Sequence, residues 1–175
     1  MHGEHLDERT STRILYWNIE AAKAQGELVI EYGRLAWKKV HDDPAYFDRM
    51  TLGKTWALGE NHWTTLDTNV PLSIGDRYVA AGYYYLGLYR SADGGTWSLI
   101  FLDPVKVRQG RPDPLEINEA PHEFIVPMKF EESSQVSELL AITLSHQKEN
   151  PPNVTLKVAW GSLQLSALLQ CQLED

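Results

Sequence analysis

The sequence predicts an all-β protein, folded as an antiparallel β-sandwich or flattened barrel of about nine strands with one short helix. Three observations lead to this fold class. Apolar and polar residues alternate with a period of two in many short runs, which is typical of half-buried strands. Turn-forming residues separate these runs, and no long window places apolar residues at helical spacing.

The first half of the chain contains four runs of this kind, each short enough to be a single strand. The predicted strands cover residues 13–20, 27–33, 62–68 and 70–74. Gly75 and Asp76 follow the last of them and predict a tight turn. The next two runs, 83–90 and 96–102, flank the segment Ser-Ala-Asp-Gly-Gly, whose Asp-Gly pair favours a β-hairpin.

Strands are also predicted for most of the C-terminal part. The runs there cover residues 122–130, 137–144 and 153–171. Gly161 interrupts the last run, so we expect either two strands or one kinked strand. Pro151 and Pro152 have no backbone N–H, and we expect them to interrupt the ladder of hydrogen bonds between strands.

Two segments depart from the strand pattern. Asp43 followed by Pro44 is typical of a helix N-terminus, so we expect a short helix over residues 42–50. Residues 103–121 contain four prolines and no sustained apolar period. We expect this second segment to be a long surface loop, and loops of that length usually bind or cover something.

The composition limits the domain organisation and the partners. We expect a flexible N-terminal segment at residues 1–12 and a single domain over residues 13–175. The formal charge is −8 without a cluster of Lys and Arg, so no nucleic-acid partner is expected. No run reaches the ~20 apolar residues of a transmembrane helix, and because the N-terminal residues include no apolar stretch, no export signal is expected in this chain. The single cysteine, Cys171, is expected to be a small core hydrophobe.

Five short motifs follow one another along the chain: IEYGR, GKTWALGENHWTT, AAGYYYLGLY, GTWSLIFL and VAWGSLQL. This succession resembles the bacterial family called domain of unknown function 2911, over roughly residues 28–169. Members of the family have a Y-x-R-P segment, a G-K-x-W-R-x-G-A-N-E-A-T segment, and later P-A-G-x-Y, W-x-L-I and W-G strands. The resemblance implies no known activity, and it implies relatives that are commonly exported or lipid-anchored.

The second motif departs from the family pattern at two places. Ala57 stands where the family tends to have arginine, and Glu60-Asn61-His62 replaces its A-N-E. An ion pair built on that arginine and glutamate is therefore absent in its usual form. The candidate ligand-binding residues from the first two motifs are Arg34, Trp56, Glu60, Asn61 and His62.

The segment around Glu60 and His62 has two interpretations. If it were a strand, Glu60, His62 and Thr64 would share one face, where the first two could act as an acid–base pair or as metal ligands. If it is a turn, Gly59 and Asn61 serve the turn and Trp63 enters the core. The turn is the favoured interpretation, because Asn bonds readily to nearby backbone.

Aromatic residues are the other candidates for a binding surface. Tyr83, Tyr85 and Tyr89 share one face of their strand. Three tryptophans could extend a surface for a glycan or peptide: Trp17, Trp37 and Trp97. The alternative is that these rings belong to the core, and we expect this for most of them. Trp37 is the expected exception, since it lies beside two lysines outside a clean strand pattern.

Signatures of catalysis are scarce in the sequence. Glu131 and Glu132 are adjacent, so an extended backbone would point them to opposite faces and prevent joint action on one bond. No catalytic residue and no cofactor are assigned. The favoured hypothesis is a non-catalytic module that binds a small ligand, a glycan or a protein. The rival is a metal-assisted hydrolase using His62 and Glu60 with distant ligands such as His41 or Asp43.

Overall fold

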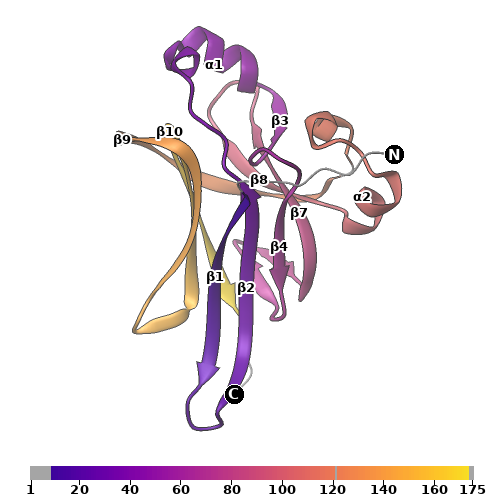
Figure 1. The fold of residues 1–175 in the computed structure, drawn as a ribbon, viewed down its shortest axis with the longest axis vertical. Coiled ribbons are helices and arrows are strands. Elements are labelled where there is room, and N and C mark those ends of the chain that lie inside the picture. The colour runs from indigo at the N-terminus through magenta and orange to yellow at the C-terminus, as the bar shows by residue number, and fades with distance from the viewer. Residues whose placement is uncertain (1–8, 121, 174–175) are drawn as a thin grey trace.

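The computed structural model describes residues 9–120 and 122–173, and it confirms a mainly β protein (Figure 1). All strand pairs that form the sheet are antiparallel. The strands are β1 (Arg9–Asn18), β2 (Lys23–Gly33), β3 (Lys54–Ala57), β4 (Thr64–Thr68), β5 (Leu72–Ile74), β6 (Arg77–Val79), β7 (Gly82–Arg90), β8 (Trp97–Leu102), β9 (His122–Gln147) and β10 (Asn150–Cys171). The helices are η1 (Lys39–Asp42), α1 (Pro44–Thr51), α2 (Pro104–Gly110) and η2 (Pro114–Glu119).

The described strands form one ten-stranded sheet that folds into two layers. Its order is β1-β2-β4-β7-β8-β9-β10-β5-β6, and β3 pairs with β7 beside β4. The order has two free ends, so the sheet is not closed, as in a sandwich or flattened barrel. The expected number of about nine strands is close to the ten in the described residues. Strands β3 and β6 were not predicted because they are very short.

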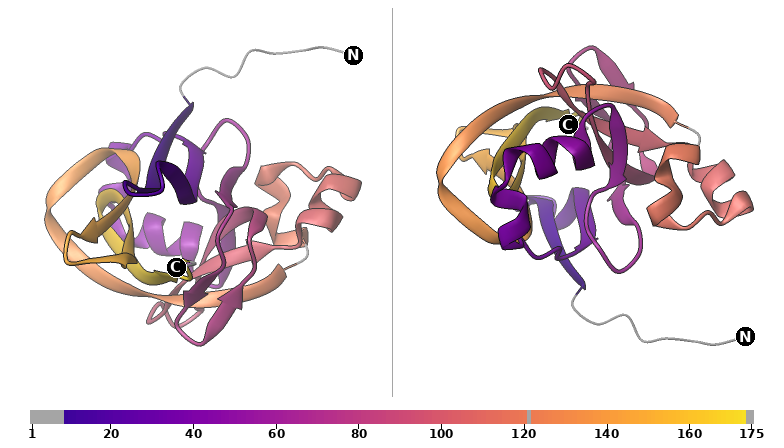
Figure 2. Two further views of the ribbon diagram at one scale, coloured as in Figure 1. Left: turned by 90° about the horizontal axis from the view of Figure 1, so that it is seen from below. Right: turned by 90° about the horizontal axis from the view of Figure 1, so that it is seen from above.

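Strand β9 belongs to both layers. Residues 122–128 pair with β8, and residues 129–132, 137 and 141–147 pair with β10. Figure 2 shows β9, in orange, curving around the molecule from the side of α2 to the layer that contains β10. The sequence predicted two strands here, at 122–130 and 137–144, and this was wrong because the polar residues between them remain extended.

The pairing between β9 and β10 is irregular in the middle. Its register passes from Gly161–Ser137 to Leu163–Glu132, so residues 133–136 are left outside it. The next residues of β9 bond instead to the chain after β2, where the amide of Trp37 donates to the carbonyl of Glu138 at 2.7 Å. Gly161 has a φ of 59°, and the register shifts on both sides of it, so the predicted kink is confirmed.

Several strand ends differ from the prediction. β1 begins at Arg9, so residues 9–12 are not part of a flexible segment; residues 1–8 lie outside the described residues. The strand predicted from residue 62 begins at Thr64. The ladder between β9 and β10 skips from Asn150 to Val154, which confirms that the two prolines interrupt it.

The helix at Asp43 is confirmed, and the predicted loop at residues 103–121 is wrong. The Asp43 side chain accepts a hydrogen bond from the amide of Ala45, and Pro44 is the first helical residue of α1. Asp103 and Asp113 cap α2 and η2 in the same way, each followed by proline. The protein therefore has two α-helices and two 3-10 helices in its described part, none long and apolar enough to cross a membrane.

Two hydrophobic cores stabilise this arrangement. The main core lies between the layers and takes the inward face of β7, including Leu86 and Leu88. The outward face of β7 carries Tyr85 and Tyr89, which pack with Val107 of α2 in a second core. These tyrosines are thus largely covered rather than forming an open binding surface. Cys171 is buried in the main core, as expected of a small hydrophobe.

Candidate functional site

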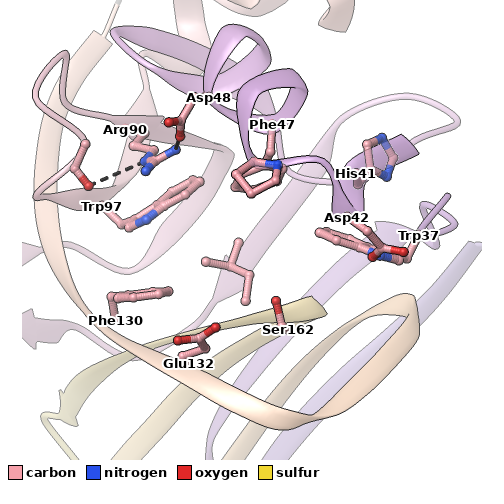
Figure 3. Close-up of a pocket in the computed structure, with 13 residues that line it drawn as sticks. Trp37, His41, Asp42, Phe47, Asp48, Arg90, Trp97, Phe130, Glu132 and Ser162 are labelled. Atoms are coloured by element: carbon pink, nitrogen blue, oxygen red, sulfur yellow. Dashed lines mark hydrogen bonds and ion pairs between the residues drawn. The ribbon is translucent and has the colours of Figure 1, made fainter. Parts of the chain in front are cut away.

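The candidate site is a cleft at the end of the sandwich that α1 covers, with a volume of about 420 Å³ (Figure 3). Four aromatic residues from separate segments line it: Trp37, Phe47, Trp97 and Phe130. We call this cavity the aromatic cleft. It opens between the segment 37–48, the β7–β8 hairpin, and the middle of β9 and β10. Its size lies within the range of small-molecule sites.

A cluster of aromatic rings supports one side of the aromatic cleft. Trp160 is 2% exposed and has ring centroids of Trp37 and His41 at 4.8 Å and that of Trp56 at 5.6 Å. Trp56 in turn lies 6.0 Å from Trp97 in an edge contact. Because aromatic pairs at such distances add to the energy of burial, the rings form a rigid support for the cleft.

The two central tryptophans of this cluster differ in their hydrogen bonding, which gives a test of the packing. Trp160 Nε1 donates to the carbonyl of Leu35 at 3.0 Å, whereas the buried Nε1 of Trp56 has no partner in the described residues. Trp160→Phe should therefore destabilise by about 1–2 kcal/mol more than Trp56→Phe. Urea unfolding of both variants measures this difference, and equal losses would contradict it.

Trp37 is held in place from two sides. Its Nε1 donates to Asp42 Oδ1 at 2.8 Å, and its ring lies directly over Gly161. A Cβ at Gly161 would be 2.3 Å from the indole, so this close approach requires glycine. The expectation that Trp37 is not an ordinary core residue agrees with its half-buried position in the aromatic cleft.

Arg90 is the one cationic residue among those that line the aromatic cleft in the described chain. Its Nη1 lies 2.7 Å from Asp48 Oδ1 and donates to Thr51 Oγ1 at 2.9 Å. The guanidinium also lies over the rings of Trp97 and Phe47, at 5.3 and 5.8 Å from their centroids. Arg90 is thus fully engaged by a carboxylate, a hydroxyl and two aromatic faces.

Glu132 lies on the inner face of the sheet. It pairs directly with the buried Leu163 of β10, and directly opposed residues of antiparallel strands share a face. With a period of two, Val126, Met128, Phe130 and Glu132 form one row along β9. The first two are buried, but Phe130 is 51% exposed and Glu132 is exposed, because the aromatic cleft opens the interior at this point.

His41 is buried beside Trp37 and lines the aromatic cleft. Its Nδ1 accepts a hydrogen bond from the amide of Lys38 at 3.0 Å. Burial, and then the charge of Lys38, lower the pKa of His41 below its ordinary value of 6.5, although Asp42 opposes this shift. The neutral imidazole is therefore the form that this part of the structure accommodates.

The lowered pKa of His41 predicts a pH dependence of stability. Because the unfolded chain binds this proton more tightly, the free energy of unfolding should fall as the pH decreases below 6.5. His41→Gln should reduce this acid sensitivity, which denaturation at several pH values measures. The substitution should not abolish the acid sensitivity, since burial also lowers the pKa of His122. His62→Gln, in an exposed turn, is the control, and an unchanged slope in His41→Gln would contradict the prediction.

The segment around Glu60 and His62 is a turn rather than a strand. Asn61 and His62 have φ values of 55° and 85°, so the alternation that would place Glu60 and His62 on one strand face does not exist. Arg9 fixes the turn by donating to the carbonyls of Asn61 at 2.6 Å and Trp63 at 2.8 Å. Trp63 is buried in the second core, as the turn interpretation expected.

The remaining candidate residues lie at two other places. Arg34 is exposed and lines another cavity together with Arg9, Thr10 and Leu139. Trp56 packs in the aromatic cluster behind the cleft. None of the five candidate residues belongs to the described lining of the aromatic cleft. The described residues also contain no group of three or more His, Cys, Asp or Glu side chains arranged to hold a metal ion.

Sequence reasoning missed most of the aromatic cleft. Its polar groups come from residues that had other predicted roles or none, namely Asp42, Asp48, Arg90, Glu132 and Ser162. Asp42 was considered as part of a possible ligand group with His41 and Asp43, but a helix start was the favoured interpretation, and Glu132 was predicted only as one of two adjacent carboxylates. The available signal was the apolar row on β9, whose period of two continues from Val126 to a charged residue.

The fold and the cleft together define a β-rich protein with a ligand-sized cavity at one end. A family model described as "Protein of unknown function (DUF2911)" matches residues 17–168. The chain belongs to this family, which confirms the resemblance seen in its motifs. No curated protein and no solved structure matches the chain.

Proposed function

We propose that the protein is a non-catalytic binding module that holds a small ligand in the aromatic cleft. One observation carries this proposal: Phe130 and Glu132 lie on the inner face of the sheet yet remain uncovered. Inner-face positions normally contact the opposite layer, and an exposed aromatic beside a charged group is therefore informative. The concave shape, the aromatic lining and the few polar groups are typical of ligand sites.

The bonding of the polar groups supports binding rather than catalysis. Asp42 accepts from Trp37, Asp48 pairs with Arg90, and Nδ1 of His41 accepts from the backbone. A general acid and base must both reach the reacting bond, and these groups hold the walls of the cleft instead. Among the charged groups of the lining, only the carboxylate of Glu132 forms no hydrogen bond or ion pair with the described residues.

The metal-assisted hydrolase remains the alternative. It needs Glu60 and His62 to combine with ligands such as His41 or Asp43. Asp43 caps α1 and His41 is bonded to the amide of Lys38, so both have structural partners. Elemental analysis of the purified protein tests this alternative, which requires a stoichiometric metal that is lost in His62→Ala.

Binding in the aromatic cleft can be tested with a panel of small probes observed by protein NMR. The probes are choline, methyl glucoside, benzoate and benzyl alcohol, which cover a cation, a neutral sugar, an anion and a neutral ring. At least one should shift the resonances of Trp37, Phe47 and Ser162, with a dissociation constant of roughly millimolar order.

A variant that fills the cavity provides the control for this test. Ser162 is half-buried in the wall of the aromatic cleft, and Ser162→Phe should abolish the shifts while the fold is retained. If no probe shifts the cleft residues, the proposal is wrong. If the shifts appear at Glu60, Asn61 and His62 instead, the binding site is the turn predicted from the sequence.

A further inference from the structure

We infer that the aromatic cleft selects a compact organic cation, such as a quaternary ammonium group. This inference deepens the proposed function and rests on it.

The charges in the aromatic cleft are unbalanced. Its lining contains the carboxylates of Asp42, Asp48 and Glu132 but only one cationic side chain, that of Arg90, among the described residues. Arg90 is paired with Asp48 at 2.7 Å. Asp42 accepts a hydrogen bond from the neutral indole of Trp37, and Glu132 has no partner within the described part of the chain. Two carboxylates are thus left without a counter-charge there, which favours a cationic ligand over a neutral or anionic one.

Arg90 shows how an organic cation is held in this cleft. Its guanidinium lies over the faces of Trp97 and Phe47 while a carboxylate contacts its edge. Two further pairs of an aromatic ring and a carboxylate line the cleft, namely Trp37 with Asp42, and Phe130 with Glu132, which follows it in the row along β9 (Figure 3). Aromatic faces combined with carboxylates recognise weakly hydrated cations, because the ring quadrupole and the negative charge act together.

The place of Glu132 distinguishes it from a solvated surface carboxylate. Its neighbour Glu131 is on the outer face and forms an ion pair with Lys129. Glu132 instead follows Phe130 in the row that begins in the main core, so its carboxylate faces the cleft. A ligand in the cleft would therefore contact Glu132 while one wall shields it from water, which strengthens the attraction between opposite charges.

The test compares choline with its uncharged isostere, in which a tert-butyl group replaces the trimethylammonium group. NMR titrations follow the indole N–H of Trp37, whose donor bond to Asp42 places it at the site. Choline should bind at least about tenfold more tightly than the isostere. Its affinity should fall as the salt concentration rises, whereas that of the isostere should not.

Two charge-removing variants and a matched control make the test specific. Glu132→Gln should weaken choline binding about tenfold and Asp42→Asn several-fold, with little effect on the isostere. Glu131→Gln removes the same charge from the outer face and should leave both affinities unchanged. Equal binding of choline and the isostere, or no effect of Glu132→Gln, would overturn the inference.

The outcomes separate this inference from the proposed function. If methyl glucoside, benzoate or benzyl alcohol shifts the cleft residues and choline does not, the cleft binds ligands but does not select cations. If none of these probes shifts the cleft residues, the proposed function fails together with the inference.

Discussion

Gly33→Ala is expected to be among the most destabilising single substitutions, lowering the free energy of unfolding by about 4 kcal/mol. A Cβ at this position would be 1.7 Å from the carbonyl oxygen of Glu60. The obstacle is backbone, and Arg9 clamps the same turn through the carbonyls of Asn61 and Trp63, so the chain has little freedom to move away. Urea denaturation followed by circular dichroism measures the loss.

Gly82→Ala is the matched control for this substitution. Gly82 is also a strand residue, but its Cβ would meet nothing closer than the ring of Tyr84 at 3.6 Å. The control should therefore change stability by less than about 1 kcal/mol. Similar losses in the two variants would show that the approach of Gly33 to the turn is not a tight constraint.

Gly161→Ala is expected to lower the free energy of unfolding by about 3 kcal/mol and to disturb the aromatic cleft. Two effects add: a φ of 59° is unfavourable for alanine, and the new Cβ would lie 2.3 Å from the indole of Trp37. Because a side chain can move where backbone cannot, we expect Trp37 to be displaced. The indole resonance of Trp37 and the thermal midpoint report the two effects.

Gly75→Ala separates the backbone contribution from the packing contribution. Gly75 has almost the same φ, 60°, and no described atom lies within 4 Å of the place that an added methyl group would occupy. Its substitution should cost only the backbone part, about 1 kcal/mol. Trp37→Ala in the Gly161→Ala background should recover part of the loss, since it removes the clash. If Gly161→Ala and Gly75→Ala lower the free energy of unfolding equally, the clash with Trp37 contributes nothing to the loss.

The fold class was predictable because alternation is a local signal. The runs at 83–90 and 96–102 paired as the intervening Asp-Gly indicated, and the predicted two faces of the first run enter different cores. The number of helices was underestimated. Asp103-Pro104 repeats the pattern that identified α1, but the short turns between prolines bury only a few apolar side chains and leave a weak apolar period.

The local alternation of polar and apolar residues did not predict that β9 is one continuous strand, nor did it predict the aromatic cleft. Residues 133–136 are mostly polar, and they remain extended because pairing with β10 continues on both sides of them. The aromatic cleft joins residues that are far apart in sequence, such as Trp37 and Glu132, so no motif contains it. The segment 59–62 was ambiguous because the positive φ values that make it a turn occur at Asn61 and His62, not only at glycine.

Sharing β9 between the layers has a mechanical consequence. In a sandwich whose two sheets contact each other only through side chains, the sheets can move relative to each other. Here the backbone of β9 is hydrogen-bonded to strands of both layers. Separating the two layers would therefore require breaking the hydrogen bonds between β9 and β8 or those between β9 and β10. The aromatic cleft lies beside the part of β9 where its pairing passes from β8 to β10, so a ligand bound there would contact the segment that joins the two layers.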